Sequence, residues 1–187
     1  MPCFFYQPGY SPWKKIEKTM NDKDIKEIQA ICLEKKAIAS KLIDPASIVI
    51  AHWTRHKCQY GCQGYGKSLC CPPHSPTPDQ TKKIIADYTI GLLIHFGSGA
   101  KISKTMAEIE REAFLKNHHK AIAFGAGPCR LCKECSLSEC KFPEIARPSM
   151  EGCGMDVYAT ARNNDFPINV LTSKDEKRNW YGLLLIE

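Results

Sequence analysis

Four cysteines fall within fourteen residues in the stretch GPCRLCKECSLSEC, residues 127–140. They are Cys129, Cys132, Cys135 and Cys140. Thiols this close together rarely serve a hydrophobic core, where a cysteine acts as a single small apolar residue. This run constrains the fold more than any other feature, because it must be organised as a zinc knuckle, a disulfide knot or an iron–sulfur cradle.

Disulfides are the least favoured of these three. The chain has eleven cysteines, an odd number that fits a disulfide framework badly. Its N-terminus, MPCFFYQPGYSPWKK, lacks the basic start, apolar stretch and small-residue cleavage site of a secretion signal. We therefore expect a cytoplasmic protein, in which thiols stay reduced and are available to bind metal.

A second cysteine-rich region lies earlier, in RHKCQYGCQGYGKSLCCPPHSPTP, residues 55–78. It contains Cys58 and Cys62, then the doublet Cys70-Cys71 followed by two prolines. An unstructured loop this long is unusual in a compact domain unless something orders it. A bound metal or cluster would do so.

The spacing favours an iron–sulfur cluster over zinc. Cys-x2-Cys-x2-Cys lets a tight loop give three thiolates to one [4Fe–4S] cube, whose fourth ligand is commonly distant and followed by proline, as Cys71 is. Zinc takes its cysteines more often in separated pairs and stays the alternative. The run departs from the bacterial ferredoxin pattern, because four residues precede Cys140 and the next proline is Pro143. Cys140 therefore serves either the same cluster as its neighbours or a second one.

Charge and motifs argue against several other functions. The net charge is +6, but the basic residues are scattered and often lie beside acids, so we do not expect specific nucleic-acid binding. The longest apolar segments are only strand-length, so no membrane span is expected. The chain has neither a Walker loop nor a G-x-G-x-x-G turn between strand and helix.

Periodicity predicts an α/β or α+β fold in a single compact domain over residues 1–187, with a small mixed sheet, flanking helices and two cysteine-rich loops. An irregular arm is expected at 1–20. Helices are expected from residue 21 or 22, from Thr77-Pro78 to about 87, from Ser103 towards Gly125, and over 150–162. Strands are expected over 47–53 and 88–96, with a hairpin over 168–187.

Three blocks of residues are familiar. They are KCQYGCQGYGKSLCCPP (57–73), FGAGPCRLCKEC (124–135) and RPSMEGCGMDV (147–157). Together they resemble an uncharacterised family of anaerobic bacteria and archaea, the cysteine-rich predicted metal-binding proteins. The resemblance implies cluster-binding segments at 55–78 and 125–153, and it favours Cys71 over Cys70. The implied ligands are Cys58, Cys62, Cys71, Cys129, Cys132, Cys135, Cys140 and Cys153.

The leading hypothesis is an iron–sulfur protein with one or two [4Fe–4S] clusters that transfers electrons to a redox partner protein. An alternative is an enzyme in which one iron lacks a cysteine ligand and binds a small substrate. A zinc-stapled binding module is the remaining alternative. The sequence specifies no oligomeric state.

Overall fold

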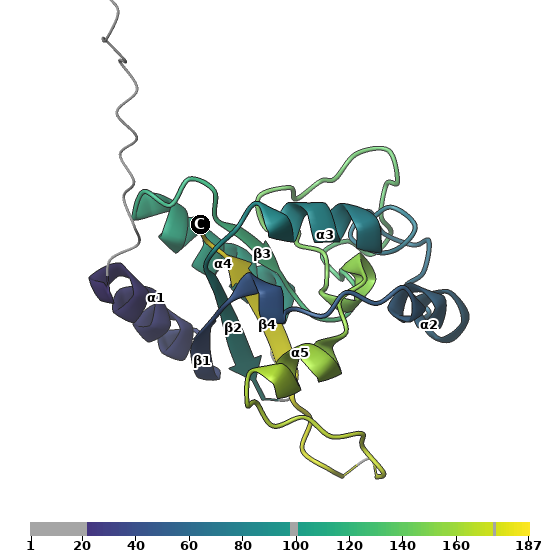
Figure 1. Cartoon of the computed structure of the whole chain (residues 1–187). Coiled ribbons are helices and arrows are strands. Elements are labelled where there is room, and N and C mark those ends of the chain that lie inside the picture. The colour runs from purple at the N-terminus through teal and green to yellow at the C-terminus, as the bar shows by residue number, and fades with distance from the viewer. Residues whose placement is uncertain (1–21, 98–100, 174) are drawn as a thin grey trace, which may run out of the picture.

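Four strands form one sheet in the order β1-β2-β4-β3. The strands are β1 (Ala37–Ile43), β2 (Gly91–Phe96), β3 (Ile122–Phe124) and β4 (Trp180–Leu185). Each neighbouring pair runs antiparallel, and Leu92 lies opposite Leu184 in the central pair. The computed structural model describes residues 22–97, 101–173 and 175–187 (Figure 1).

The helices lie on both sides of this sheet. They are α1 (Asp22–Glu34), α2 (Trp53–Gly61), α3 (Pro78–Ala86), α4 (Ile102–Leu115) and α5 (Val157–Asn163), with short 3-10 turns η1 (Pro45–Ser47) and η2 (Glu151–Cys153). These elements form a single compact α+β domain, which confirms the predicted fold class. The predicted mixed sheet is instead antiparallel, because the connections from β1 to β2 and from β3 to β4 re-enter the sheet at the end where the previous strand stops, and β4 also runs opposite to β2. The predicted arm at 1–20 lies outside the described residues.

Two separate cores pack against the two faces of the sheet. Alternate side chains of a strand point to opposite faces, so Leu92 and Ile94 of β2 pack with α1 and α4. Leu93 points the other way, into a core that includes α5 and the buried Met150 and Met155. Every residue of β2 is buried, as the continuous apolar sequence predicts. Figure 1 shows α1 on one side of the sheet and α2, α3 and α5 on the other.

Local signals predicted several boundaries correctly. The first helix begins at Asp22. The helix α3 begins with a capping box, in which Thr77 Oγ1 accepts a hydrogen bond from Gln80 N and Gln80 Oε1 accepts one from Thr77 N. The first prediction rests on helical spacing and on acidic residues in the first turn, and the second on a threonine that satisfies a free N–H group of the first turn.

Four predictions of secondary structure are wrong or incomplete. The segment 47–53 is no strand, because Asp44 caps the turn η1, and the first strand is 37–43 instead. The helix α4 ends at Leu115 rather than continuing to Gly125. Gly154, with φ of 90°, divides the predicted helix over 150–162 into η2 and α5. Of the predicted hairpin, the described residues form only β4.

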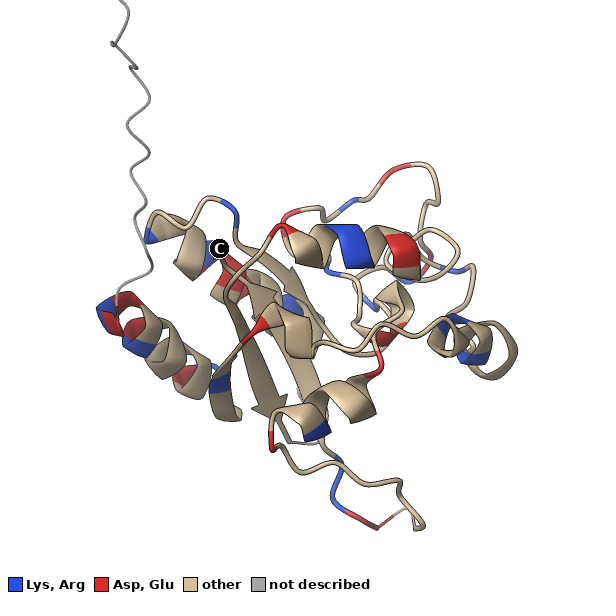
Figure 2. Cartoon of the chain, viewed as in Figure 1, with Lys and Arg blue, Asp and Glu red and all other residues tan. Residues whose placement is uncertain are grey.

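Charged residues of both signs share the surface helices. Figure 2 shows Lys and Arg beside Asp and Glu on α1 and α3. Within the described part of the chain, no helix has the length and apolar character needed to cross a membrane.

Candidate metal centre

Arg55 on α2 fixes the first cysteine loop. Its guanidinium donates to the carbonyl oxygens of Pro76 at 2.7 Å and Ser75 at 3.1 Å. It also reaches the carbonyl oxygen of Gly152 in η2 at 3.4 Å, to which Ser75 Oγ donates at 2.7 Å. Because arginine offers five donors in a rigid fork, one side chain holds α2, the loop and η2 together. Part of the predicted loop over 55–78 is therefore helical, and the irregular segment is 62–77.

Three predicted ligands, Cys58, Cys62 and Cys71, line one cavity of about 180 Å³. These residues are termed the inner thiol group. Cys58 lies on α2, Cys62 directly follows it, and Cys71 comes from the loop, where only 7% of its surface is exposed. The backbone N–H of Gly64 donates to Cys62 Sγ at 3.4 Å. Amide donors of this kind stabilise thiolates that bind metal.

Gly64 is also the point where the two cysteine loops touch. A Cβ atom at this position would lie 2.9 Å from Pro128 Cβ, which is closer than two such atoms can pack. It would lie 3.5 Å from Cys62 Sγ and 3.7 Å from Cys71 Sγ. The absence of a side chain at Gly64 therefore keeps space beside the two sulfurs and lets the second loop approach the first.

The thiols of the inner group line a cavity and do not converge on one point. Among the described residues, no three His, Cys, Asp or Glu side chains converge closely enough to hold one metal ion. The inner thiol group nevertheless shares one cavity, with Pro72 and Gly127 from the two loops in its wall.

Cys153 lies behind the inner thiol group in the hydrophobic core. It is fully buried in η2, and Thr81 Oγ1 donates to its carbonyl oxygen at 2.6 Å. Burial raises the pKa of the Cys153 thiol to about 12, and the positive charge of Arg55 opposes that shift. The thiol also interacts electrostatically with Cys71, so the predicted ligand Cys153 is next to the inner group although it does not line the cavity.

Glu151 is a site residue that the sequence argument missed. Its side chain lines the inner cavity, and its Oε2 atom is shielded from solvent with no hydrogen-bond partner among the described residues. Burial raises the pKa of this carboxyl, while hydrogen bonds to backbone N–H groups and Ser149 oppose the shift. A buried oxygen without a partner is costly, so it is a candidate contact for a metal or a ligand.

The second loop forms a separate group around Cys70. Its thiol lies close enough to those of Cys129 and Cys140 to interact with both electrostatically. Burial, followed by these neighbouring thiols, raises the pKa of Cys70 to about 12. Cys70, Cys129 and Cys140 are termed the outer thiol group. Cys71, which is favoured over Cys70 as a ligand from the sequence, lies in the inner thiol group, so the two residues of the doublet belong to different groups.

Cys132 and Cys135 lie on the same loop between Cys129 and Cys140. Both are half-buried, and Cys135 Sγ donates to the carbonyl oxygen of Ser136 at 3.7 Å. All four cysteines of the run GPCRLCKECSLSEC are thus partly accessible from solvent, in contrast to Cys71 and Cys153.

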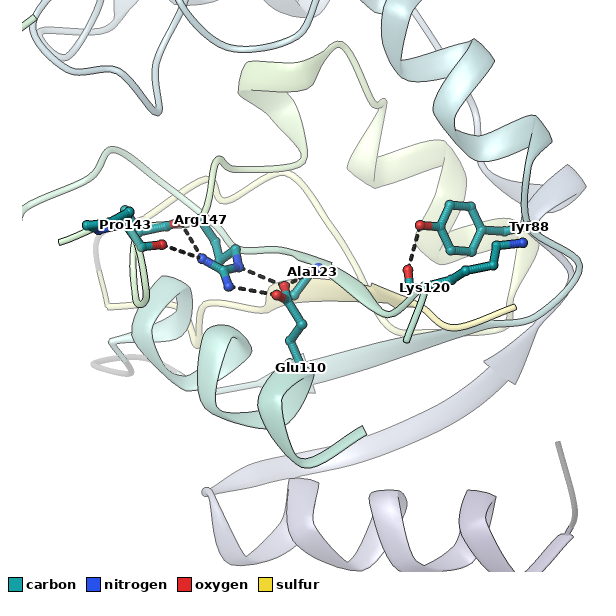
Figure 3. Close-up of polar contacts among 7 residues, drawn as sticks. Tyr88, Glu110, Lys120, Ala123, Pro143 and Arg147 are labelled. Carbon is teal, nitrogen blue, oxygen red and sulfur yellow. Dashed lines mark hydrogen bonds and ion pairs between the residues drawn. The ribbon is translucent and has the colours of Figure 1, made fainter. Parts of the chain in front are cut away.

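A bidentate ion pair anchors the end of the second loop (Figure 3). Arg147 donates to both carboxylate oxygens of Glu110 on α4, through Nε at 2.7 Å and Nη2 at 2.6 Å. Glu110 Oε2 also accepts from Ala123 N in β3 at 2.7 Å. Arg147 donates in addition to the carbonyl oxygen of Pro143 at 3.1 Å. The loop is therefore tied to the sheet and to α4 just beyond Cys140.

A cleft of about 1080 Å³ borders the inner thiol group. It lies against α2, α5 and the segments 168–171 and 178–181, and Cys58, Cys62 and Glu151 line both the cleft and the smaller cavity. The sequence argument did not predict this cleft. Its lining includes exposed aromatic side chains, such as Tyr60 at 74% exposure.

Comparison with known proteins gives one match. The family model described as "Predicted metal-binding protein (DUF2284)" matches residues 41–186, which include every predicted ligand. No curated protein matches. No solved structure matches.

Proposed function

The chain belongs to the family of predicted metal-binding proteins (DUF2284), and we propose that it holds two [4Fe–4S] clusters and transfers electrons to a partner protein. The observation that carries this proposal is that the adjacent residues Cys70 and Cys71 belong to different thiol groups. Cys71 lines the cavity together with Cys58 and Cys62, whereas Cys70 interacts electrostatically with Cys129 and Cys140 and does not line that cavity. Two neighbouring thiols that face different groups support two metal sites rather than one.

The inner site fits a thiolate-bound cluster in three respects. Its donors are sulfur atoms, which suit iron–sulfur clusters and zinc better than carboxylate-binding ions. Its cavity of about 180 Å³ is kept open beside Gly64, where a Cβ atom would intrude. The Gly64 N–H already points at Cys62 Sγ. Cys153 or Glu151 would complete this site, and its remaining ligands would be Cys58, Cys62 and Cys71.

The outer site draws on the second loop. Its ligands would be Cys129, Cys132, Cys135 and Cys140, with Cys70 as a fifth thiol that can take the place of one of them. The spacing Cys-x2-Cys-x2-Cys supports iron–sulfur ligation here. Bound in these two sites, [4Fe–4S] clusters would supply one-electron redox chemistry.

Exposed apolar side chains beside the outer group support a protein partner. Leu137 and Phe142 flank Cys140 in sequence and are 46% and 38% exposed. Exposed apolar residues next to a redox site provide the small contact area that weak electron-transfer complexes use. The outer loop is therefore the proposed docking face.

A second candidate function rests on the cleft. If Cys153 stays outside the inner site, one iron would lack a cysteine ligand and would be available to a small substrate. The cleft of about 1080 Å³ that borders Cys58 and Cys62 favours this reading. Pockets that bind small molecules commonly have volumes of roughly 300–1,000 Å³.

Metal and sulfide analysis of anaerobically purified protein tests the proposal. Two clusters predict about eight irons and eight acid-labile sulfides per chain, with a broad absorbance near ~400 nm. Zinc, a d¹⁰ ion, has no such band. Protein that contains zinc but neither iron nor sulfide would contradict the proposal and favour the zinc-stapled module.

A further inference from the structure

The cleft beside the inner thiol group carries an excess of unpaired positive charge. Lys57, Arg162 and Arg178 line it. None of the three forms an ion pair with a carboxylate among residues 22–97, 101–173 and 175–187. Of the carboxylates in the lining, Asp156 is engaged at the start of α5, where its Oδ1 accepts from Ala159 N at 3.0 Å. Three cations without a carboxylate partner in the described part of the chain favour an anionic ligand.

Two of these cations stack on aromatic rings. Lys57 Nζ lies 5.1 Å from the centroid of the Trp53 ring, and the Arg162 guanidinium lies 5.7 Å from that of Tyr158. Cation–π contacts leave the hydrogen-bond donors of a guanidinium free for an acidic group. Trp53 is 47% exposed and Tyr158 is 37% exposed, so much of each side chain stays accessible.

Further aromatic surface faces the same space. Trp180 and Tyr60 line the cleft from β4 and α2. Together with Trp53 they offer flat apolar surfaces against which a planar molecule can stack. The cleft therefore combines aromatic faces with unpaired cations, while Cys58 and Cys62 lie in its wall.

We propose that this cleft binds a small organic anion with a flat, aromatic body and a phosphate or carboxylate group. Arg162 and Arg178 match the acidic group, and the aromatic rings of Trp53, Tyr60 and Trp180 match the flat body. The inference rests on the proposed function in one respect, since Cys58 and Cys62 bring the bound molecule beside the metal-bearing inner thiol group. It names the class of molecule on which the second candidate function would act.

Calorimetric titration of the full-length, anaerobically purified protein tests this site. Phenyl phosphate is the anionic probe, and benzyl alcohol is the neutral probe with the same ring. We expect measurable binding of phenyl phosphate only. Arg162→Gln and Arg178→Gln should each weaken that binding about tenfold, because each removes a charge-assisted contact. Arg111→Gln is the matched control, since Arg111 is exposed on α4 and does not line the cleft.

Two results would overturn the inference. One is equal affinity for phenyl phosphate and benzyl alcohol. The other is wild-type affinity in both Arg162→Gln and Arg178→Gln, measured on variants whose circular dichroism shows a native fold. Quenching of tryptophan fluorescence is a second readout, since Trp53 and Trp180 line the cleft.

Iron analysis of the same samples separates this inference from the proposed function. Protein with iron and sulfide that does not bind phenyl phosphate contradicts the cleft assignment alone. Protein without iron that binds phenyl phosphate through Arg162 and Arg178 contradicts the proposed function and leaves the cleft assignment standing. If the protein contains iron and sulfide and also binds phenyl phosphate, this ligand should perturb the electron paramagnetic resonance spectrum of the reduced protein.

Discussion

Cys70 and Cys71 are adjacent in the chain, yet their thiols belong to different groups. The Cys71 thiol lies beside Cys62, close to Gly64. The Cys70 thiol interacts electrostatically with Cys129 and Cys140 on the second loop. The segment 62–77 therefore contributes to both thiol groups, with Cys71 in the inner group and Cys70 in the outer group.

This arrangement predicts that serine substitutions at the doublet affect different metal sites. Cys71→Ser should reduce the iron held by the inner thiol group, and Cys70→Ser should alter the outer one. Cys71→Ser should lose up to about half of the iron, whereas Cys70→Ser removes only the fifth thiol of the outer site and should change the electron paramagnetic resonance spectrum with a smaller loss of iron. Cys32→Ala is the control, since Cys32 is buried between α1 and the sheet. Unchanged iron content and spectrum in Cys70→Ser would show that Cys70 is not a ligand.

Arg55 should stabilise the centre more than any surface cation does. Arg55→Gln removes the guanidinium that donates to the carbonyl oxygens of Ser75, Pro76 and Gly152. Loss of several charge-assisted bonds should lower the free energy of unfolding by about 3 kcal/mol. Anaerobic urea denaturation measures this change.

The control for Arg55 is Arg111→Gln, which removes the same charge from an exposed position on α4. We expect a change within about 0.5 kcal/mol there. Arg55→Lys should not restore stability, because an ammonium lacks the planar fork that reaches several carbonyl groups. Equal stability of the Arg55→Gln and Arg111→Gln variants would show that the contacts of Arg55 contribute nothing.

Sequence reasoning was most successful where the determining contacts are local. The capping box at Thr77 depends on residues three positions apart, and the buried strand β2 follows from its continuous apolar run. The predicted strand over 47–53 failed for a local reason as well. Asp44 Oδ1 accepts a hydrogen bond from Ala46 N and forms a turn, which leaves Ile50 with only an isolated bridge to Met155.

The centre depends on contacts between distant segments, and these could not be predicted from spacing. The cysteines that line the inner cavity were all expected as ligands. The electrostatic interaction of Cys70 with Cys129 was not, because it depends on the close approach of the two loops at Gly64 and Pro128. The cleft is assembled from α2, α5 and the segments 168–171 and 178–181. No local pattern in any one of these segments indicates the cavity that they form together.

Gly64 should be intolerant of a side chain. In Gly64→Ala the new Cβ atom would lie 2.9 Å from Pro128 Cβ, so the two cysteine loops must move apart. Overpacking of this kind costs about 1–3 kcal/mol, and we expect the iron content to fall. Gly61→Ala is the matched control, since no atom lies within 4 Å of a Cβ at that position. Similar iron content and stability in the two variants would contradict a close contact between the loops.

Tyr181 should make the stability of the domain depend on pH above 10. Its side chain is 1% exposed, and its hydroxyl donates to the carbonyl oxygen of Pro167 at 2.5 Å. Burial raises the pKa of Tyr181 from its ordinary value near 10 to about 12. Because the neutral form is favoured in the folded state, this stabilisation is fully present below pH 10 and is lost as the pH rises towards 12.

Tyr181→Phe isolates this effect, because both proteins share every other titrating group. At pH 8 the variant should be less stable by about 1 kcal/mol, the contribution of the lost hydrogen bond. Between pH 8 and pH 11 the wild-type protein should lose about 1.4 kcal/mol relative to the variant, so the difference should vanish or reverse. Urea denaturation at pH 8 and at pH 11 measures the difference in free energy of unfolding between the two proteins. A gap that stays constant from pH 8 to pH 11 would mean that the Tyr181 hydroxyl titrates equally in the folded and unfolded chains.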